Sequence, residues 1–182
     1  GEDIYTTQAD TVIINGGNNQ TTYTWNDGSN SQYFDVAINA TESYDILVTN
    51  SFGCQDRDTI QIYTYDIGVQ SIDNLNTCDN SLSLSPTINI QMLSNDTLEI
   101  GSIINVSYTF NGTTIDEIVT LTEQLTSNAT YAYTFTEPLV IADSGSYLIE
   151  SSVAMINEVV TDNNSLESGI RVGSLPFELG AD

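Results

Sequence analysis

Two cysteines, Cys54 and Cys78, are the first residues of this chain whose chemistry deserves examination. A disulfide is the ordinary expectation for two cysteines in a secreted protein. The strand pattern argues against this pairing, because Cys54 follows a turn that points away from the second half of the chain. Cys78 follows a strand that leads away in the other direction. We therefore expect the Cys54–Cys78 disulfide to be absent, leaving two buried or unpaired thiols.

Carboxylates form the second chemically capable group. The chain has 25 Asp and Glu residues, only two arginines, and no lysine or histidine, for a formal net charge of −23. Calcium needs about six to eight oxygen ligands from converging loops, and the spacing of an EF-hand loop is absent. We favour a solvated acidic surface; if calcium binds, we expect it beside Asp66, where the loops of two modules would converge. Acidic groups occur at Asp56 and Asp58, Asp73 and Asp79, Asp96 and Glu99, Asp116 and Glu117, and Asp162 and Glu167.

The same composition disfavours catalysis and several classes of partner. Without histidine or lysine, the chain has no Ser-His-Asp triad, no Cys-His pair and no Schiff-base lysine. Glycosidases use paired carboxylates, but no acidic pair here has a recognisable pocket context. We predict no enzymatic activity, no catalytic residue and no cofactor. The negative charge repels phosphate groups, which excludes nucleic acid as a partner. The sequence has no apolar run of about 18 residues, so we predict no insertion into a membrane.

Short alternating strands must hold these residues. The stretch from Ser43 to Asp66 reads as a closing hairpin, because apolar residues alternate with polar ones on both sides of the turn at 50–53. Earlier runs at 10–15, 23–25 and 32–39 predict further strands, with Trp25 as a core residue. The first 65 residues therefore predict a sandwich of about six or seven short strands.

The second half repeats this architecture. Alternating runs at 66–72, 87–93, 103–110, 114–121, 130–136, 145–156 and 166–172 predict about seven strands. Asn111-Gly112 lies between two of these runs and is a specific signal for a tight hairpin. Tyr44 and Tyr147 each follow a polar corner, where we expect the hydroxyl to bond a backbone group.

The predicted fold class is thus all-β, with two tandem Ig-like or FnIII-like antiparallel β-sandwich domains arranged end to end. The first domain spans residues 1–65 and the second spans 66–173. Residues 174–182 follow a completed sandwich and contain Pro176, so they are expected to be a linker to a following module.

Two resemblances rest on loosely spaced motifs. The segments YTWNDG at 23–28, SYDILV at 43–48 and GCQDRDTI at 53–60 are similar to the Ig-like, PKD-type repeats of large secreted surface proteins of Bacteroidetes, including gliding-motility adhesins. The second half resembles a CARDB-type domain, an Ig/FnIII-like module. Its matching segments are VSYTFNG at 106–112, YAYTFT at 131–136, GSY at 145–147 and DNNS at 162–165.

These resemblances carry implications for function. They imply a non-catalytic structural or adhesive module of a large extracellular or cell-surface adhesin, whose partners are neighbouring Ig-like modules, a surface polysaccharide or another cell-surface protein. They also imply O-glycosylation at Asp-Thr-hydrophobic motifs, which makes Thr11, Thr59 and Thr97 candidate sites; the alternative is that each motif simply begins a strand.

Two further functions stay open. One is a carbohydrate-binding module, in which exposed tyrosines stack on sugar rings; the alternative role of those tyrosines is to pack in the core or across strands. The other is an accessory domain of a secreted hydrolase. The tyrosines concerned are Tyr63, Tyr65, Tyr131 and Tyr133.

Overall fold

The computed structural model describes residues 2–7, 10–18, 22–77 and 83–173, which contain sixteen strands and no helix. The chain divides into two compact units. Unit 1 consists of Gly1–Asp66 together with Ser94–Asp96 and Asn157–Val160; unit 2 consists of Ile67–Leu93, Thr97–Ile156 and Thr161–Asp182. A division placed after Tyr65 does not anticipate the two short segments that unit 1 takes from later in the chain.

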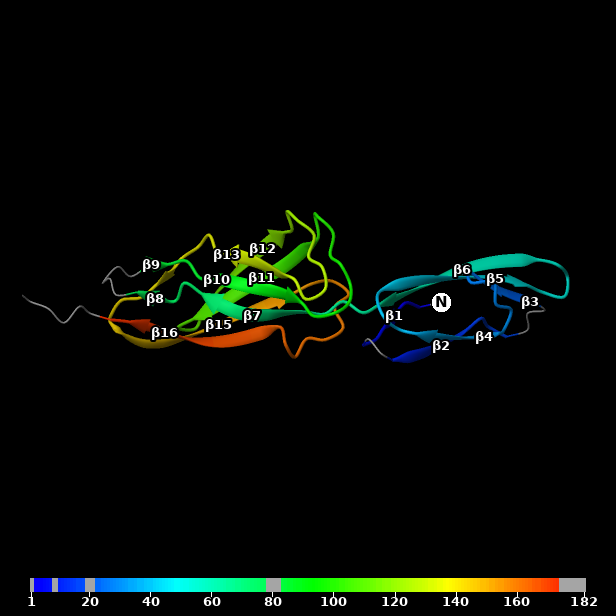
Figure 1. Cartoon of the computed structure of the whole chain (residues 1–182), viewed down its shortest axis with the longest axis horizontal. Coiled ribbons are helices and arrows are strands. Elements are labelled where there is room, and N and C mark those ends of the chain that lie inside the picture. The colour runs from blue at the N-terminus through cyan, green and yellow to red at the C-terminus, as the bar shows by residue number, and fades with distance from the viewer. Residues whose placement is uncertain (1, 8–9, 19–21, 78–82, 174–182) are drawn as a thin grey trace, which may run out of the picture. The chain divides into compact units, whose positions relative to one another are not determined.

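Unit 1 is an Ig-like β-sandwich with two layers (Figure 1). Among the described strands of this unit, every pair is antiparallel except β1–β6, which is parallel. One layer has the order β1 (Ile4–Tyr5), β6 (Gln55–Tyr63), β5 (Glu42–Thr49) and β3 (Thr22–Trp25), and the other layer contains β2 (Thr11–Asn15) and β4 (Tyr33–Ala37).

The core of unit 1 follows the alternation of its strands. Side chains of the inward parity, including Val36, Ile46 and Ile62, are buried between the layers. Trp25 is 3% exposed, which confirms it as a core residue. Its indole N–H donates to the carbonyl of Ser31 at 2.8 Å, so the one polar atom of this side chain is satisfied.

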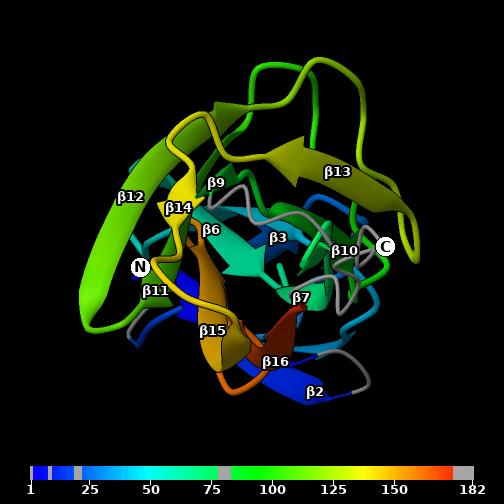
Figure 2. The same cartoon turned by 90° about the vertical axis from the view of Figure 1, so that its left-hand side faces the viewer.

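Unit 2 is a second Ig-like sandwich, and the strands expected from alternation are confirmed. In Figure 2, β12, β11, β15 and β16 follow one another around one side of the unit, and β13, β10 and β7 lie on the other side. The sheets are β13 (Thr130–Thr134), β10 (Thr87–Met92) and β7 (Ile67–Asp73); β12 (Thr113–Thr120), β11 (Ile103–Phe110), β15 (Gly145–Ala154), β16 (Ser165–Val172) and β8 (Asn76–Thr77); and the small pair β14 (Leu139–Val140) and β9 (Ser83–Leu84).

The first segment of unit 2 changes sheets. It pairs antiparallel with β10 as β7, and then parallel with β16 as β8. Between the two lies Asn74, whose φ of 60° turns the chain through the left-handed region that asparagine tolerates better than most residues. Its side-chain amide donates to the Thr87 hydroxyl at 2.8 Å and fixes this crossing point.

The β11–β12 hairpin confirms the turn expected at Asn111-Gly112. Both residues have positive φ, 49° and 77°, as a type I′ turn requires. Nothing lies within 4 Å of a Cβ added at Gly112, so only backbone strain opposes a side chain there.

Gly112→Ala is therefore expected to lower the free energy of unfolding of unit 2 by about 1 kcal/mol. Gly169→Ala is the matched control, because a Cβ there also meets nothing within 4 Å and its φ is not positive. Urea unfolding followed by amide hydrogen exchange in β11 and β12 measures both. Equal effects of the two substitutions would contradict the expectation.

The two tyrosine corners differ. The Tyr147 hydroxyl donates to the carbonyl of Asp143 at 2.8 Å, which confirms the expected bond to the backbone. For Tyr44 the expectation is wrong, because its hydroxyl donates to the side-chain carboxylate of Glu42 at 2.8 Å. Glu42 lies two residues earlier on the same strand face and reaches the hydroxyl first. Burial, together with this carboxylate, raises the pKa of Tyr44 to about 12.

Candidate functional site

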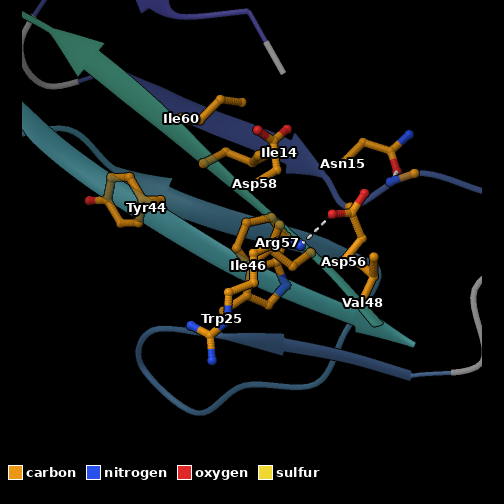
Figure 3. Close-up of a pocket in the computed structure, with 12 residues that line it drawn as sticks. Ile14, Asn15, Trp25, Tyr44, Ile46, Val48, Asp56, Arg57, Asp58 and Ile60 are labelled. Atoms are coloured by element: carbon orange, nitrogen blue, oxygen red, sulfur yellow. Dashed lines mark hydrogen bonds between the residues drawn. The ribbon is translucent and has the colours of Figure 1, made fainter. Parts of the chain in front are cut away.

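A hollow of about 250 Å³ opens between the layers of unit 1 (Figure 3). Residues of both layers line it. Its apolar lining comes from four strands and consists of Ile14 from β2, Trp25 from β3, Ile46 and Val48 from β5, and Ile60 from β6.

The rim of the hollow is charged because of strand parity. Asp56 and Asp58 share the inward face of β6 with Ile60, and they extend that face beyond the end of the core. They lie opposite Val48 and Ile46 of β5. Arg57 is the cationic residue among those that line the hollow, and its backbone N–H donates to Asp56 Oδ1 at 2.9 Å (Figure 3). Asp56 and Asp58, which were expected on a solvated acidic surface, therefore border the apolar hollow.

This arrangement suits a small ligand with an apolar body and a cationic or hydroxyl-bearing end. It does not offer an open aromatic ring for stacking on a sugar. Trp25 is buried and already stacks on Phe34, with ring centroids 5.0 Å apart.

The four tyrosines considered for sugar stacking are engaged in internal contacts. Tyr63 stacks on Tyr5 with centroids 5.1 Å apart, and Tyr65 lies 6.4 Å from Tyr63. Tyr131 shares a 3.3 Å hydrogen bond with Thr122, and Tyr133 packs edge-on against the ring of Phe135. The first pair belongs to unit 1 and the second pair to unit 2. These contacts favour the alternative of internal packing, and among the ring contacts named here the Tyr63–Tyr5 stack joins two strands.

Glu117 is a hydrogen-bonding centre in unit 2. Its carboxylate accepts the Tyr133 hydroxyl at 2.6 Å, the Thr136 backbone N–H and hydroxyl at 3.0 and 2.7 Å, and the Glu137 N–H at 3.0 Å. Burial by itself raises the pKa of Glu117, but these bonds outweigh burial and hold the pKa below its ordinary value of 4.5. The carboxylate thus fastens β12 to β13 and to the chain that follows β13.

The acidic pair at 116–117 is therefore divided by strand parity. Asp116 is exposed, whereas Glu117 faces inward and is half-buried. A carboxylate at an inward position of an otherwise apolar strand face is the sequence signal for such a hydrogen-bonded link between strands. The structure alone supplies its partners.

Asp96 is the buried carboxylate of unit 1. It is 6% exposed and accepts hydrogen bonds from the Thr41 backbone N–H at 2.6 Å, the Thr64 hydroxyl at 2.7 Å and the Ser94 hydroxyl at 2.9 Å. The expected grouping of Asp96 with Glu99 on an acidic surface is wrong. Glu99 instead accepts a bond from Gln124 at 2.6 Å.

The candidate modification sites are accessible. Thr11, Thr59 and Thr97 are all exposed, and the Thr59 hydroxyl also donates to Asp45 at 2.5 Å. Only Thr11 begins a strand, so the alternative that each motif starts one is wrong for the other two. Glycosylation at these positions stays a prediction.

The next features are the cysteines and the acidic residues that were considered for metal binding. Cys54 has an exposed free thiol, whereas Cys78, Asp79 and residues 174–182 lie outside the described residues. Within the described ranges, no group of three or more Asp, Glu or Cys side chains is arranged to hold a metal ion. The described part also contains no helix long and apolar enough to cross a membrane.

The fold and the hollow define an all-β protein built of two Ig-like sandwich units. No protein-family model matches the chain, and no curated protein matches it. It is similar in structure to the CARDB domain of the PF1109 protein from Pyrococcus furiosus, determined in complex with di-metal ions, at 19% identity over 61% of this chain and 96% of that chain (TM-score 0.43). Membership of the CARDB or PKD-type families stays a prediction.

Two further solved structures contain tandem modules. The fibronectin(III)-like modules of CbhA from Clostridium thermocellum match at 12% identity over 100% of this chain and 95% of that chain (TM-score 0.34). A chain of the complex of Dpr2 Ig1-Ig2 with DIP-Theta Ig1-Ig3 matches at 14% identity over 96% of this chain and 62% of that chain (TM-score 0.40).

Proposed function

We propose that this chain is a non-catalytic pair of structural modules in an extracellular or cell-surface adhesin, where it spaces and presents binding regions. The observation that carries the proposal is that each unit closes a separate core. Unit 1 buries Trp25, Ile46 and Ile62, and unit 2 buries Ile90, Ile149 and Ile170. Units that each bury their own apolar surface fold without a shared core and are suited to serial arrangement in a long chain.

The polar chemistry of the described residues agrees with a structural role. Glu117, Asp96 and Glu42 direct their carboxylates at hydroxyl or N–H donors of their own unit. The lowered pKa of Glu117 is the opposite of what a general acid needs at neutral pH. The net charge of −23 favours a soluble chain that repels copies of itself, which suits a presented stalk.

A display experiment tests the spacing role. The full chain is placed between a surface anchor and a small epitope tag, and a Gly/Ser linker with the same number of residues replaces it in the comparison. We expect the two units to make the tag accessible to a bulky antibody conjugate that the flexible linker excludes, because folded units cannot collapse onto the surface. Equal accessibility with both inserts would overturn the proposal.

The second candidate is ligand binding, and the hollow in unit 1 favours it. Trp25 is the only tryptophan of the chain and lines the hollow, so its fluorescence reports occupancy. Under the spacing proposal, titration with soluble starch, xylan or hexylamine leaves this fluorescence unchanged. A saturable change that Asp56→Asn and Asp58→Asn abolish, and that Asp45→Asn leaves intact, would establish ligand binding instead.

A further inference from the structure

The two parallel strand pairs among the described strands occupy equivalent places in the two units. In unit 1, β1 lies beside β6, with Ile4 opposite Ile62 and Tyr5 opposite Tyr63. In unit 2, β8 lies beside β16, with Asn76 opposite Arg171 and Thr77 opposite Val172. Each pair therefore joins the first segment of a unit to its last strand. We name them clasp 1 (residues 3–6 with 61–63) and clasp 2 (residues 76–77 with 171–172).

We propose that the two clasps bear mechanical tension along the chain, an inference that rests on the proposed role as a spacer. A pull on both sides of a unit draws its first segment backward and its last strand forward. In a parallel pair these movements are opposed along one axis, so the bonds across the pair are loaded together. An antiparallel pair of terminal strands would be pulled from one end, and its bonds would break one after another.

Clasp 1 has anchors beyond its two strand pairs. Asp3 Oδ1 accepts the backbone N–H of Gln61 at 3.0 Å, and the Thr6 N–H donates to the Tyr63 carbonyl at 3.2 Å. The Tyr5 ring stacks on Tyr63 with an interplanar angle of 20°. Ile4 packs against the core of unit 1. Sliding of the first segment therefore breaks hydrogen bonds and removes an apolar side chain from the core in a single step.

In clasp 2, the first segment of unit 2 has passed from one sheet to the other just before it pairs with β16. The segment first pairs with β10, passes the left-handed Asn74, and buries Leu75 to 4% exposure immediately before β8. On the other side of the clasp, Val172 is 5% exposed. A pull from the amino-terminal side must detach β7 from β10 before the load reaches clasp 2. The buried Leu75, next to β8, and the buried Val172, in β16, thus resist sliding of the two segments of this clasp.

Single-molecule stretching of the full chain between two handle domains tests the inference. Thr6→Pro removes the N–H that bonds Tyr63, and Asp3→Ala removes the acceptor for Gln61. Each is expected to raise the unfolding rate of unit 1 at fixed force by about tenfold, the equivalent of one hydrogen bond broken in the transition state. The matched control is Val36→Ala, which weakens the core of unit 1 on the opposite layer.

The result that would overturn the inference is a rate change per unit of lost equilibrium stability that is the same for Thr6→Pro and Val36→Ala. A second geometry makes the test independent of any effect on folding. In a Cys78→Ser chain, a handle on Cys54 and another on the amino-terminal side pull β1 and β6 from the same end, so clasp 1 should open at lower force than with handles at both chain ends. Equal forces in the two geometries also contradict the inference. A chain that spaces its tag but fails these tests leaves the proposed function intact.

Discussion

Replacing Glu117 with alanine is expected to lower the free energy of unfolding of unit 2 by about 2–4 kcal/mol, because several donors lose one charged acceptor. The Thr136 and Glu137 N–H groups and the Tyr133 hydroxyl all point at this carboxylate. Amide hydrogen exchange in peptides from β12 and β13 measures the loss. Trp25 fluorescence follows unit 1 in the same sample and should not change.

The pH dependence of Glu117→Gln separates the effect of the negative charge on stability from the effect of the side chain's shape. The folded pKa of Glu117 lies below its ordinary value of 4.5, so its contribution to stability is complete above about pH 4.5 and is lost as the pH falls through the folded pKa. Glu117→Gln removes this contribution at every pH. The stability difference between wild type and variant should therefore shrink as the pH falls from neutrality to below 4.

At alkaline pH, the dependence of the stability of unit 2 on pH has the opposite sign. Burial, followed by the bond and charge of Glu117, raises the pKa of Tyr133 to about 12 from 10.0. The stabilisation from this hydroxyl is complete below about pH 10 and is lost as the pH rises through 12. Asp116→Asn is the matched control, because Asp116 is the exposed neighbour of Glu117. If the free energy of unfolding varied with pH in the same way in Glu117→Gln and Asp116→Asn, the proposed hydrogen-bonded link between β12 and β13 would be contradicted.

Asp96→Ala is the second substitution with a large expected effect, a loss of about 2–4 kcal/mol in the unfolding of unit 1. It leaves the Thr41 N–H and the buried Thr64 hydroxyl without their acceptor. Urea unfolding monitored by Trp25 fluorescence measures the loss. Asn95→Ala is the control, since Asn95 is exposed and its side-chain amide makes one bond of 3.4 Å, to the Asn39 carbonyl.

Asp96→Asn should cost less than Asp96→Ala. A carboxamide keeps one oxygen for the Thr41 N–H, and the Thr64 hydroxyl can rotate to accept from its NH₂ group. The exchange of the Thr41 amide reports whether that bond survives. If both variants unfold at the wild-type urea concentration, Asp96 does not hold segment 94–96 in unit 1.

Local pattern was sufficient for the strands and for the main turn. The run at 103–110 is β11 without any change of bounds, and the closing hairpin of unit 1 appears as β5 and β6. These elements were predictable because alternation with a period of two is visible in any strand of five or more residues. Asn111-Gly112 was predictable because few residue pairs adopt positive φ in succession.

The two-residue strands were not predictable. β1, β8, β9 and β14 are too short to display alternation, and each pairs with a segment far away in the sequence. The hollow in unit 1 was also not predictable, because its lining residues come from four strands of two layers and form no motif in the sequence. Asp56 and Asp58 read as surface acids until the end of the core is located relative to them.

Composition and periodicity alone thus determined that this is an acidic, all-β chain of two sandwich units with Trp25 in a core. Only the tertiary structure decided which carboxylates are solvated and which act as internal acceptors. Asp116 and Glu117 are neighbours with the same chemistry, yet one is exposed and the other joins β12 to β13. The physical reason is that hydrogen-bond partners are fixed by distances between strands remote in sequence, whereas alternation is written in consecutive residues.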